Sequence, residues 1–195
     1  MLTKDTLVKM LDPDRMPAHG GTGQWPEPGT WREVDGELVP CENGLHVCTI
    51  RDALTHWAAP EMWVVEVDGE RIAEADKTVV RRARLVSRVE TWNDRILRLF
   101  AADCAEAVLP IFERQYPGDL RLRQVIIAAR QYADGEIGAA AWAVARDAAW
   151  DAAGDAARAV ARDAAWAAAW AAAWDAAWGA QVDRLLPYLN GEVGA

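Results

Sequence analysis

The sequence predicts an α+β protein in which a small β-rich N-terminal domain precedes an α-helical bundle rich in alanine and tryptophan. Two observations lead to this fold class. Apolar residues alternate with a period of two in short segments of the first ninety residues, and the period changes to 3.6 near Thr91. From residue 137 onward alanine, the best helix former, dominates the chain. We therefore expect a small α+β domain over residues 1–90 and a helical domain over residues 91–195.

The first domain is expected to consist mainly of short strands. Residues 1–11 show helical spacing of apolar side chains, which favours a short helix, and residues 12–29 carry four prolines and a glycine run typical of a loop. Asp35-Gly36 predicts a tight hairpin turn, because a glycine readily adopts the positive φ that such a turn requires. The remaining elements expected here are strands over residues 44–49, 62–67 and 78–89 and a helix over residues 52–58.

The second domain is expected to be helical throughout. A helix capped by Thr91 should reach residue 116, and a second should cover residues 120–133. Residues 137–189 contain an internal duplication, since the octapeptide at 143–150 recurs at 159–166. A single helix over this segment would be about 75 Å long, so we expect the chain to fold back at glycines, with Gly154 and Gly179 as the breaks.

Tryptophans follow one another at intervals of four residues in the last part of this segment, at Trp166, Trp170, Trp174 and Trp178. Four residues exceed one helical turn by about 40°, so these side chains form a slowly drifting ridge. An exposed ridge of this size would be a large apolar patch, so we expect it to be buried. It packs between helices of one chain or forms an interface for self-association or for a protein partner.

The composition excludes several classes of protein. The chain has 30 acidic and 21 basic residues, a balance that works against binding nucleic acid. It shows no signal peptide and no apolar run of the roughly 20 residues that a membrane span needs, so we expect a cytoplasmic protein, in the host cell if a phage encodes it. Three cysteines, an odd number, indicate free thiols rather than a disulfide framework.

Cys41, His46 and Cys48 are the candidate metal ligands, with His19 or His56 as a fourth. A paired CxxC motif is absent, however, and cysteine is often simply a buried residue, so we expect neither a metal nor another cofactor. Arg82, Arg84 and Arg88 lie on one face of the expected strand 78–89. They form a solvated sheet face, pair with the acidic helices, or bind an acidic ligand.

Two stretches of the chain resemble known families. Residues 31–85, with Cys41-Glu42-Asn43-Gly44-Leu45-His46-Val47-Cys48 and Trp63-Val64-Val65-Glu66-Val67-Asp68-Gly69, resemble an uncharacterised domain of phage and prophage proteins. Residues 100–178, with Ala102-Asp103-Cys104-Ala105-Glu106-Ala107-Val108-Leu109-Pro110, resemble the helical putative immunity protein family of actinobacteria. These resemblances imply a non-enzymatic protein-binding or assembly protein of phage or prophage type, active in host–phage or toxin–immunity conflict.

A fold-level similarity to ADP-ribosyltransferases supplies the alternative. The relevant segments are His19-Gly20-Gly21-Thr22, then Gly44-Leu45-His46-Val47-Cys48-Thr49 with the helix that follows, and an acidic residue at Glu74 or Asp76. This similarity implies an enzyme or nucleotide-binding domain fused to a helical interaction domain. Its catalytic residues would be His19, His46, Glu74 and Asp76. We consider a binding protein the better interpretation, because likeness of fold does not carry activity.

Overall fold

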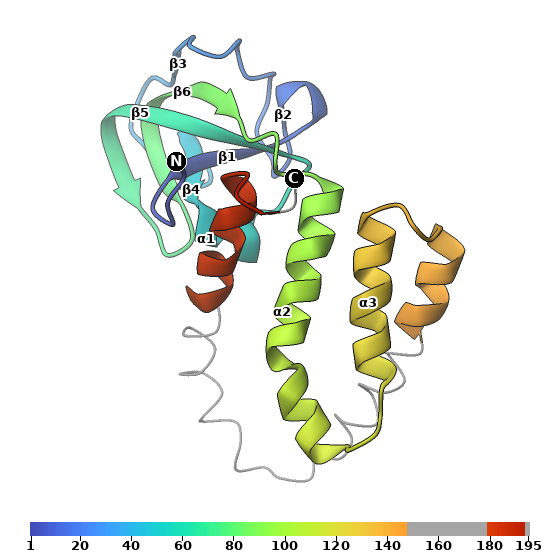
Figure 1. Ribbon diagram of the computed structural model, residues 1–195. Helices are drawn as coiled ribbons and strands as arrows, with labels where there is room; N and C mark the ends of the chain where they lie inside the picture. Colours follow the sequence, from blue (N-terminus) through green and yellow to red (C-terminus); the bar gives the residue numbers. More distant parts are fainter. Residues whose placement is uncertain (148–178, 194–195) are drawn as a thin grey trace. The chain divides into compact units, whose positions relative to one another are not determined.

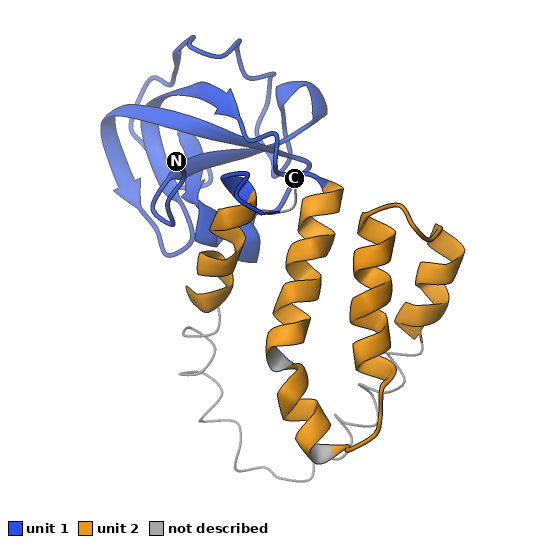
Figure 2. Ribbon diagram, viewed as in Figure 1, with its two compact units in different colours: residues 1–93, 189–193 blue, residues 94–188, 194–195 orange. Residues whose placement is uncertain are grey.

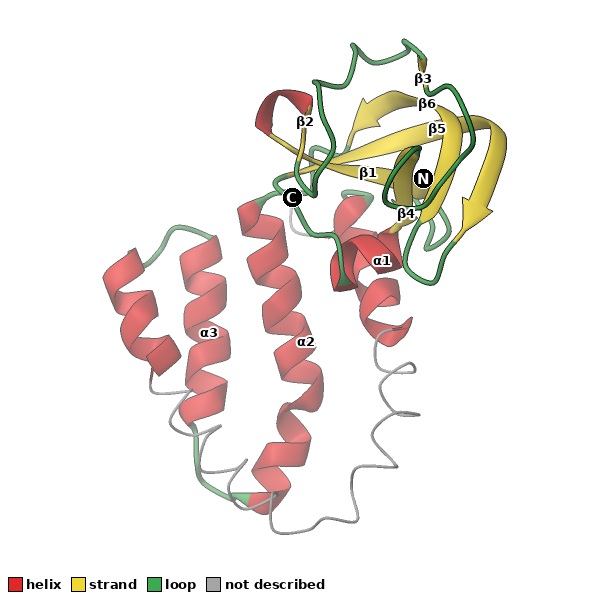
Figure 3. Ribbon diagram, turned by 180° about the vertical axis from the view of Figure 1, so that it is seen from behind, coloured by secondary structure: helices red, strands yellow, loops and turns green. Residues whose placement is uncertain are grey.

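A computed structural model describes residues 1–147 and 179–193 (Figure 1). The chain divides into two compact units, coloured separately in Figure 2: unit 1 contains Met1–Asn93 and Leu189–Val193, and unit 2 contains Asp94–Tyr188. The strands of the described chain lie in unit 1 and the long helices in unit 2 (Figure 3). This confirms the predicted fold class. The division into two domains over residues 1–90 and 91–195 stays a prediction, because a domain is a part of the chain that folds independently and compactness alone does not test this.

Unit 1 contains a curved six-stranded antiparallel sheet. Its strands are β1 (Leu7–Asp12), β2 (Met16–Pro17), β3 (Arg32–Glu33), β4 (Leu45–Thr49), β5 (Glu61–Ala73) and β6 (Thr78–Arg88). β1 pairs with β4 and β5, and β6 also pairs with β4 and β5, so these four strands form a closed ring. β2 adds to β1, and β3 adds to β6. Ring closure pairs strand edges that would otherwise be open to other chains.

β5 and β6 form a long hairpin whose curvature closes the ring. The register between them shifts at two places, between Val64 and Val65 and between Asp68 and Arg71. Such bulges bend a strand and increase its twist. β5 therefore does not end at Asp68-Gly69, as the turn residues there suggest, but continues to Ala73.

Apolar side chains from all parts of this ring form the core of unit 1. They include Leu11, Trp25, Leu45, Val47, Trp63, Val65, Ala83 and Leu85. A short helix, α1 (Ile50–Thr55), follows β4 directly. It begins there because the Asp52 amide donates a hydrogen bond to Thr49 Oγ1 at 3.2 Å. α1 buries Ile50 and Ala53.

The N-terminal segment differs from the expectation. Residues 7–12 form β1 instead of a helix, because this strand is paired on both edges and buries Val8, Met10 and Leu11. An apolar run that is buried on both faces of a strand cannot be told from a helix by its spacing.

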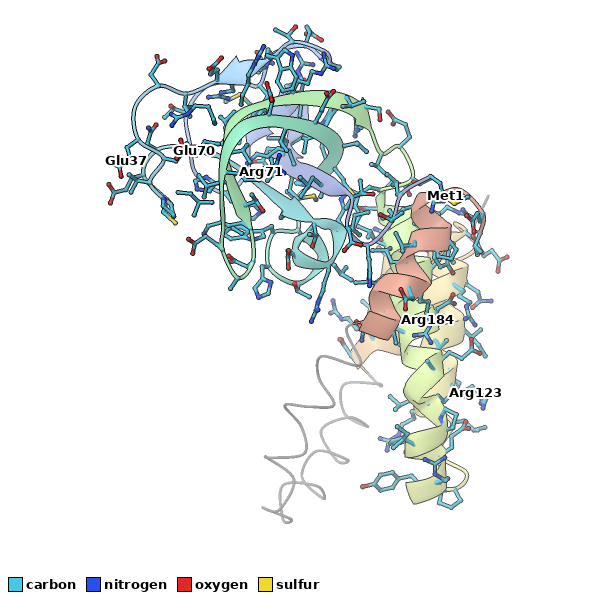
Figure 4. All side chains as sticks on the ribbon, turned by 90° about the vertical axis from the view of Figure 1, so that its left-hand side faces the viewer. Met1, Glu37, Glu70, Arg71, Arg123 and Arg184 are labelled. Carbon is cyan, nitrogen blue, oxygen red and sulfur yellow. The ribbon has the colours of Figure 1, made fainter. Side chains whose placement is uncertain are left out.

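The prediction of a hairpin around Asp35-Gly36 is also wrong. Gly36 has the positive φ of 79° that the turn needs, but Arg32–Glu33 pairs with β6 and not with residues 38–39. The Arg81 guanidinium holds this turn against the ring, because it donates hydrogen bonds to the carbonyls of Val34, at 3.0 Å, and of Gly36. Figure 4 shows Glu37 and Glu70 at the same edge of unit 1.

Unit 2 is built on two antiparallel helices, α2 (Asp94–Gln115) and α3 (Arg121–Ala133). Their contact is apolar and contains Ala102, Leu109 and Ile126, with Leu122 and Ala129 packed against them. Residues 139–147 and 179–189 are also helical. Gly179 is therefore part of a helix, whereas Gly154 lies outside the described residues.

The segment after the last helix belongs to unit 1. Asn190 pairs with the backbone of Leu2 through two hydrogen bonds of 2.7 and 3.1 Å. The Thr91 hydroxyl donates to the Leu189 carbonyl at 2.6 Å, and α2 begins only at Asp94. Thr91 therefore anchors this segment and does not cap α2 as expected.

Candidate functional site

Unit 1 contains a cavity of about 250 Å³ that opens between the loop 19–21, β1, β4 and the turn before β6. Strand alternation and two glycine-rich turns bring residues from distant parts of the sequence to this place. Its polar lining side chains are Lys9, His19, Cys41, Glu42, His46, Cys48 and Lys77. Val8, Met10, Val47 and Trp57 supply apolar surface. The cavity is small by the standard of ligand pockets, which measure about 300–1,000 Å³.

His46 and Cys41 are in direct contact in this cavity. The Cys41 amide donates a hydrogen bond to His46 Nε2 at 3.2 Å, which the unusual positive φ of 66° at Cys41 makes possible. Nε2 is thus an acceptor, and the proton of the neutral ring is on Nδ1. Burial, together with the charges of Lys9 and Lys77, lowers the pKa of His46 and favours this neutral form.

Cys41, His46 and Cys48, the candidate metal ligands, are in different surroundings. The Cys48 thiol is buried and faces the Val8 carbonyl at 3.8 Å, while Cys41 is exposed with Lys77 Nζ at 3.5 Å from its sulfur. Burial raises the pKa of Cys48 to about 12, so this side chain is a neutral thiol. Within the described part of the chain, no three His, Cys, Asp or Glu residues are arranged to hold a metal ion.

His19 connects the glycine-rich loop to the segment after α1. Its Nε2 lies 3.0 Å from the Trp57 carbonyl and 3.2 Å from the Ala58 carbonyl, so this nitrogen carries a proton and donates to them. The two rings meet edge to face, with centroids 5.4 Å apart. Trp57 is fixed in turn by the hydrogen bond from its Nε1 to the Asp76 carbonyl at 2.9 Å. His19 therefore positions one wall of the cavity.

The four residues of the enzymatic alternative are placed in two groups. His19 and His46 line the cavity, but Glu74 and Asp76 are not among its lining residues. They lie in the turn between β5 and β6, where the Glu74 amide bonds to the Lys77 carbonyl at 2.8 Å. Their assignment as catalytic residues stays a prediction.

Lys9 is a cavity residue that the sequence analysis did not single out. It projects from β1 between two buried neighbours, Val8 and Met10. Its ammonium lies 5.7 Å from the centroid of the Trp25 ring. Burial is the main reason that its pKa falls to about 8. The signal in the sequence was a single charge within the apolar run of residues 7–11.

The arginine face of β6 pairs with acidic residues of β5. Arg84 binds Glu66 at 2.6 Å, and Arg82 lies 3.4 Å from Asp68. Both guanidinium groups also stack on the Trp31 ring. The distance to the ring centroid is 4.4 Å for Arg82 and 4.7 Å for Arg84. These ion pairs are intramolecular and join β6 to the neighbouring strand β5. Pairing of this face with the acidic helices and binding of an acidic ligand stay predictions.

In unit 2, Asp103 connects three helices. Its carboxylate accepts hydrogen bonds from Arg130 of α3 at 2.7 Å and from Tyr188 of the last helix at 2.6 Å. Burial and the hydrogen bond to Asp103 raise the pKa of Tyr188 to about 12. Arg130 also binds Glu106 at 2.6 Å, and these hydrogen bonds to Glu106 and Asp103 raise the pKa of Arg130. The last helix, which carries Arg184 in Figure 4, is thus fixed to α2 through Tyr188, at the same carboxylate that binds α3.

The predicted interface residues Trp166, Trp170, Trp174 and Trp178 lie outside the described residues. Trp142 precedes these tryptophans by a multiple of four residues, and it is among the residues that the structure describes. Its ring stacks on Tyr132, with centroids 5.9 Å apart and an interplanar angle of 7°. This tryptophan therefore contributes to packing between helices.

Comparison with known proteins finds a family match in the C-terminal, helical part of the chain. Residues 87–181 match a family model described as "Imm-5 like putative immunity protein". No curated protein and no solved structure matches the chain. Among the described residues, no helix has the length and apolar character needed to cross a membrane. The match confirms the predicted likeness of the C-terminal half to this family.

Proposed function

We propose that the chain is a non-enzymatic immunity protein that binds and neutralises a protein toxin through unit 2. The observation that carries this proposal is the family match over residues 87–181, which takes in both α2 and α3. A toxin is a macromolecule, and recognition of it requires an exposed surface rather than a closed cavity.

The surface of α2 and α3 offers apolar residues for such recognition. Ile111 is 59% exposed, Leu120 is 53% exposed and Ile127 is 50% exposed. Leu120 is the N-cap residue of α3 and Ile127 lies within this helix, seven residues later. Seven residues are about two helical turns, so both residues lie on the same side of the helix. Burying exposed apolar side chains of this kind against a partner is favourable, because it removes apolar surface from water.

The acidic side chains of these helices are in ion pairs with arginines. Besides the Arg130 cluster, Glu113 binds Arg123 at 2.7 Å and Asp94 binds Arg98 at 2.9 Å. Such pairs orient the helices and do not form a catalytic centre, which requires titratable groups converging in a concave site. The surface that remains for a partner is the apolar one.

The setting of this activity follows from the resemblances. We propose a phage or prophage protein that acts in the cytoplasm of the host cell, on the basis of the resemblance that the sequence of residues 31–85 bears to a phage-associated domain. Trp166, Trp170, Trp174 and Trp178 are proposed as a further interface, for the same partner or for self-association.

A growth-rescue experiment tests the proposal. The full chain is expressed together with toxin domains encoded beside its gene, and survival is compared with binding measured by calorimetry. We expect rescue by the wild type, and loss of both rescue and binding with Leu120→Glu and Ile127→Glu. Val86→Glu is the matched control, because Val86 is an apolar residue of β6 with a similar exposure of 49%.

Two results would contradict the proposal. If none of the toxins is neutralised or bound by the full chain, the immunity function is wrong. If rescue occurs but is unchanged when Ile111, Leu120 and Ile127 are all replaced by glutamate, the α2–α3 surface is not the binding surface.

A further inference from the structure

We propose that the cavity of unit 1 binds a small organic molecule bearing a carboxylate or phosphate group, held by the ammonium groups of Lys9 and Lys77. This function is independent of toxin binding by unit 2.

Lys9 supplies a positive charge that is not neutralised by a carboxylate. Among the residues that the structure describes, its ammonium lies over the Trp25 ring, and after burial the groups that act on its pKa are Cys48, which raises it, and Arg32, which lowers it. Cys48 is a neutral thiol, so none of these groups is a carboxylate. Lys9 is partly buried, and the loss of water around an ammonium without an anionic partner is costly. Burial is accordingly the largest cause of the lowered pKa of Lys9. An anion that enters the cavity would supply the missing partner.

Lys77, which also lines the cavity, supplies the second charge. Its ammonium lies 3.5 Å from Cys41 Sγ and 5.1 Å from the centroid of the Trp57 ring. The Asp76 carboxylate is 3.9 Å away, at the outer limit of an ion pair, so it neutralises this charge only in part. Lys77 keeps donor positions available for a ligand, because an ammonium has three.

The positive charges of Lys9 and Lys77 both act on the His46 ring. The charge of each lowers the pKa of this ring, although Lys9 comes from β1 and Lys77 from the turn before β6. The region beside His46 is therefore the most favourable place in the cavity for a negative group. Glu42 also lines the cavity, and its negative charge disfavours a ligand that carries more than one or two negative charges.

The dimensions of the cavity set the size of the ligand. A volume of about 250 Å³ suits a metabolite and not a peptide or a polynucleotide. The glycine-rich loop at Gly20 and Gly21 lines the cavity without side chains that would fill it. Trp57 and Val47 offer apolar surface for the carbon skeleton of the ligand.

Calorimetry on the full chain tests this inference with three probes: inorganic phosphate, succinate and the neutral analogue succinamide. We expect phosphate or succinate to bind and succinamide not to bind. Lys9→Met or Lys77→Met should weaken the binding about tenfold or more, the loss expected for one charge-assisted hydrogen bond. Lys4→Met is the matched control, since Lys4 is an exposed lysine outside the cavity.

The histidine ring supplies a second readout. The chain has only three histidines, so the His46 signals can be assigned in an NMR titration by His46→Gln. Binding of an anion should raise the pKa of His46, because it neutralises the two lysine charges that lower it. If neither anion binds at millimolar concentration, or if succinamide binds equally well, the inference is wrong. It is also wrong if binding survives in a folded Lys9→Met, Lys77→Met double variant.

Discussion

Gly44 is the residue at which a single methyl group should damage the cavity most. It has a φ of 147°, and a Cβ built on it would lie 2.2 Å from Cγ1 of Val79, a fully buried residue of β6. The strained backbone should cost about 1–3 kcal/mol, and the overpacking about 1–3 kcal/mol more. Gly44→Ala should therefore destabilise unit 1 by about 2–6 kcal/mol, because β4 must move away from β6.

A double-mutant cycle separates the two contributions. Val79→Ala alone removes two buried methyl groups and should cost about 2 kcal/mol. Combined with Gly44→Ala, it removes the clash, so the double variant should be more stable than the sum of the single changes by about 1–3 kcal/mol. Gly20→Ala is the control for backbone strain, since Gly20 has a φ of 81° and open space around its Cβ position.

Hydrogen exchange in increasing urea, followed by mass spectrometry, measures these changes in each unit separately. Peptides from β4 and β6 report on unit 1, and peptides from α3 are the internal reference in unit 2. Strictly additive costs in the double variant would refute the steric argument. A cost of Gly20→Ala equal to that of Gly44→Ala would show that backbone strain alone is responsible.

Three further predictions concern single residues. Asp103→Ala removes the acceptor shared by α3 and the last helix and should cost about 1.5–3 kcal/mol in thermal unfolding, whereas Glu106→Ala, at a more exposed position, should cost less than about 1 kcal/mol. Iodoacetamide at neutral pH should modify the exposed Cys41 and leave the buried Cys48 intact until the chain unfolds, as peptide mass spectrometry will show. Because the pKa of Lys9 is lowered from 10.5 to about 8, the unfolded chain binds this proton more tightly and stability should rise between these two pH values. Lys9→Met should accordingly stabilise the chain most below pH 8 and lose this advantage by pH 10.5, as urea titrations at a series of pH values can measure.

The elements that the sequence predicts well are those whose pattern is local. The expected strands over residues 44–49 and 78–89 correspond to β4 and β6, and the expected helices over 91–116 and 120–133 correspond to α2 and α3. In each of these, one period of apolar residues extends over the whole element. Capping and turn residues then place the ends within a few positions.

The errors occur where the ring of strands closes. β1 is buried on both faces, so its apolar residues do not alternate, and its spacing resembles that of a helix. β3 pairs with a strand some fifty residues later instead of forming the nearby hairpin. Such long-range pairings depend on packing of the whole unit and leave little trace in local sequence.

The candidate site shows the same limit. Similarity to a known fold singled out His19 and His46, which do line one cavity, but neither lysine was singled out. Lys77 directly precedes the expected strand over residues 78–89, and Lys9 lies within the helix expected over residues 1–11. Their convergence follows from the pairing of β1 with β4 and of β4 with β6, which only the structure reveals.

The net charge of −9 bears differently on nucleic acid and on a small anion. A duplex presents phosphates along its whole length, so it needs many basic residues over an extended surface. A small anion in the cavity interacts mainly with charges inside one Debye length, about 8 Å at physiological ionic strength, and the more distant acidic residues are screened. Two lysines with incomplete carboxylate pairing can therefore attract such a ligand in an otherwise acidic protein. The composition that argues against nucleic acid is thus compatible with an anion site inside unit 1.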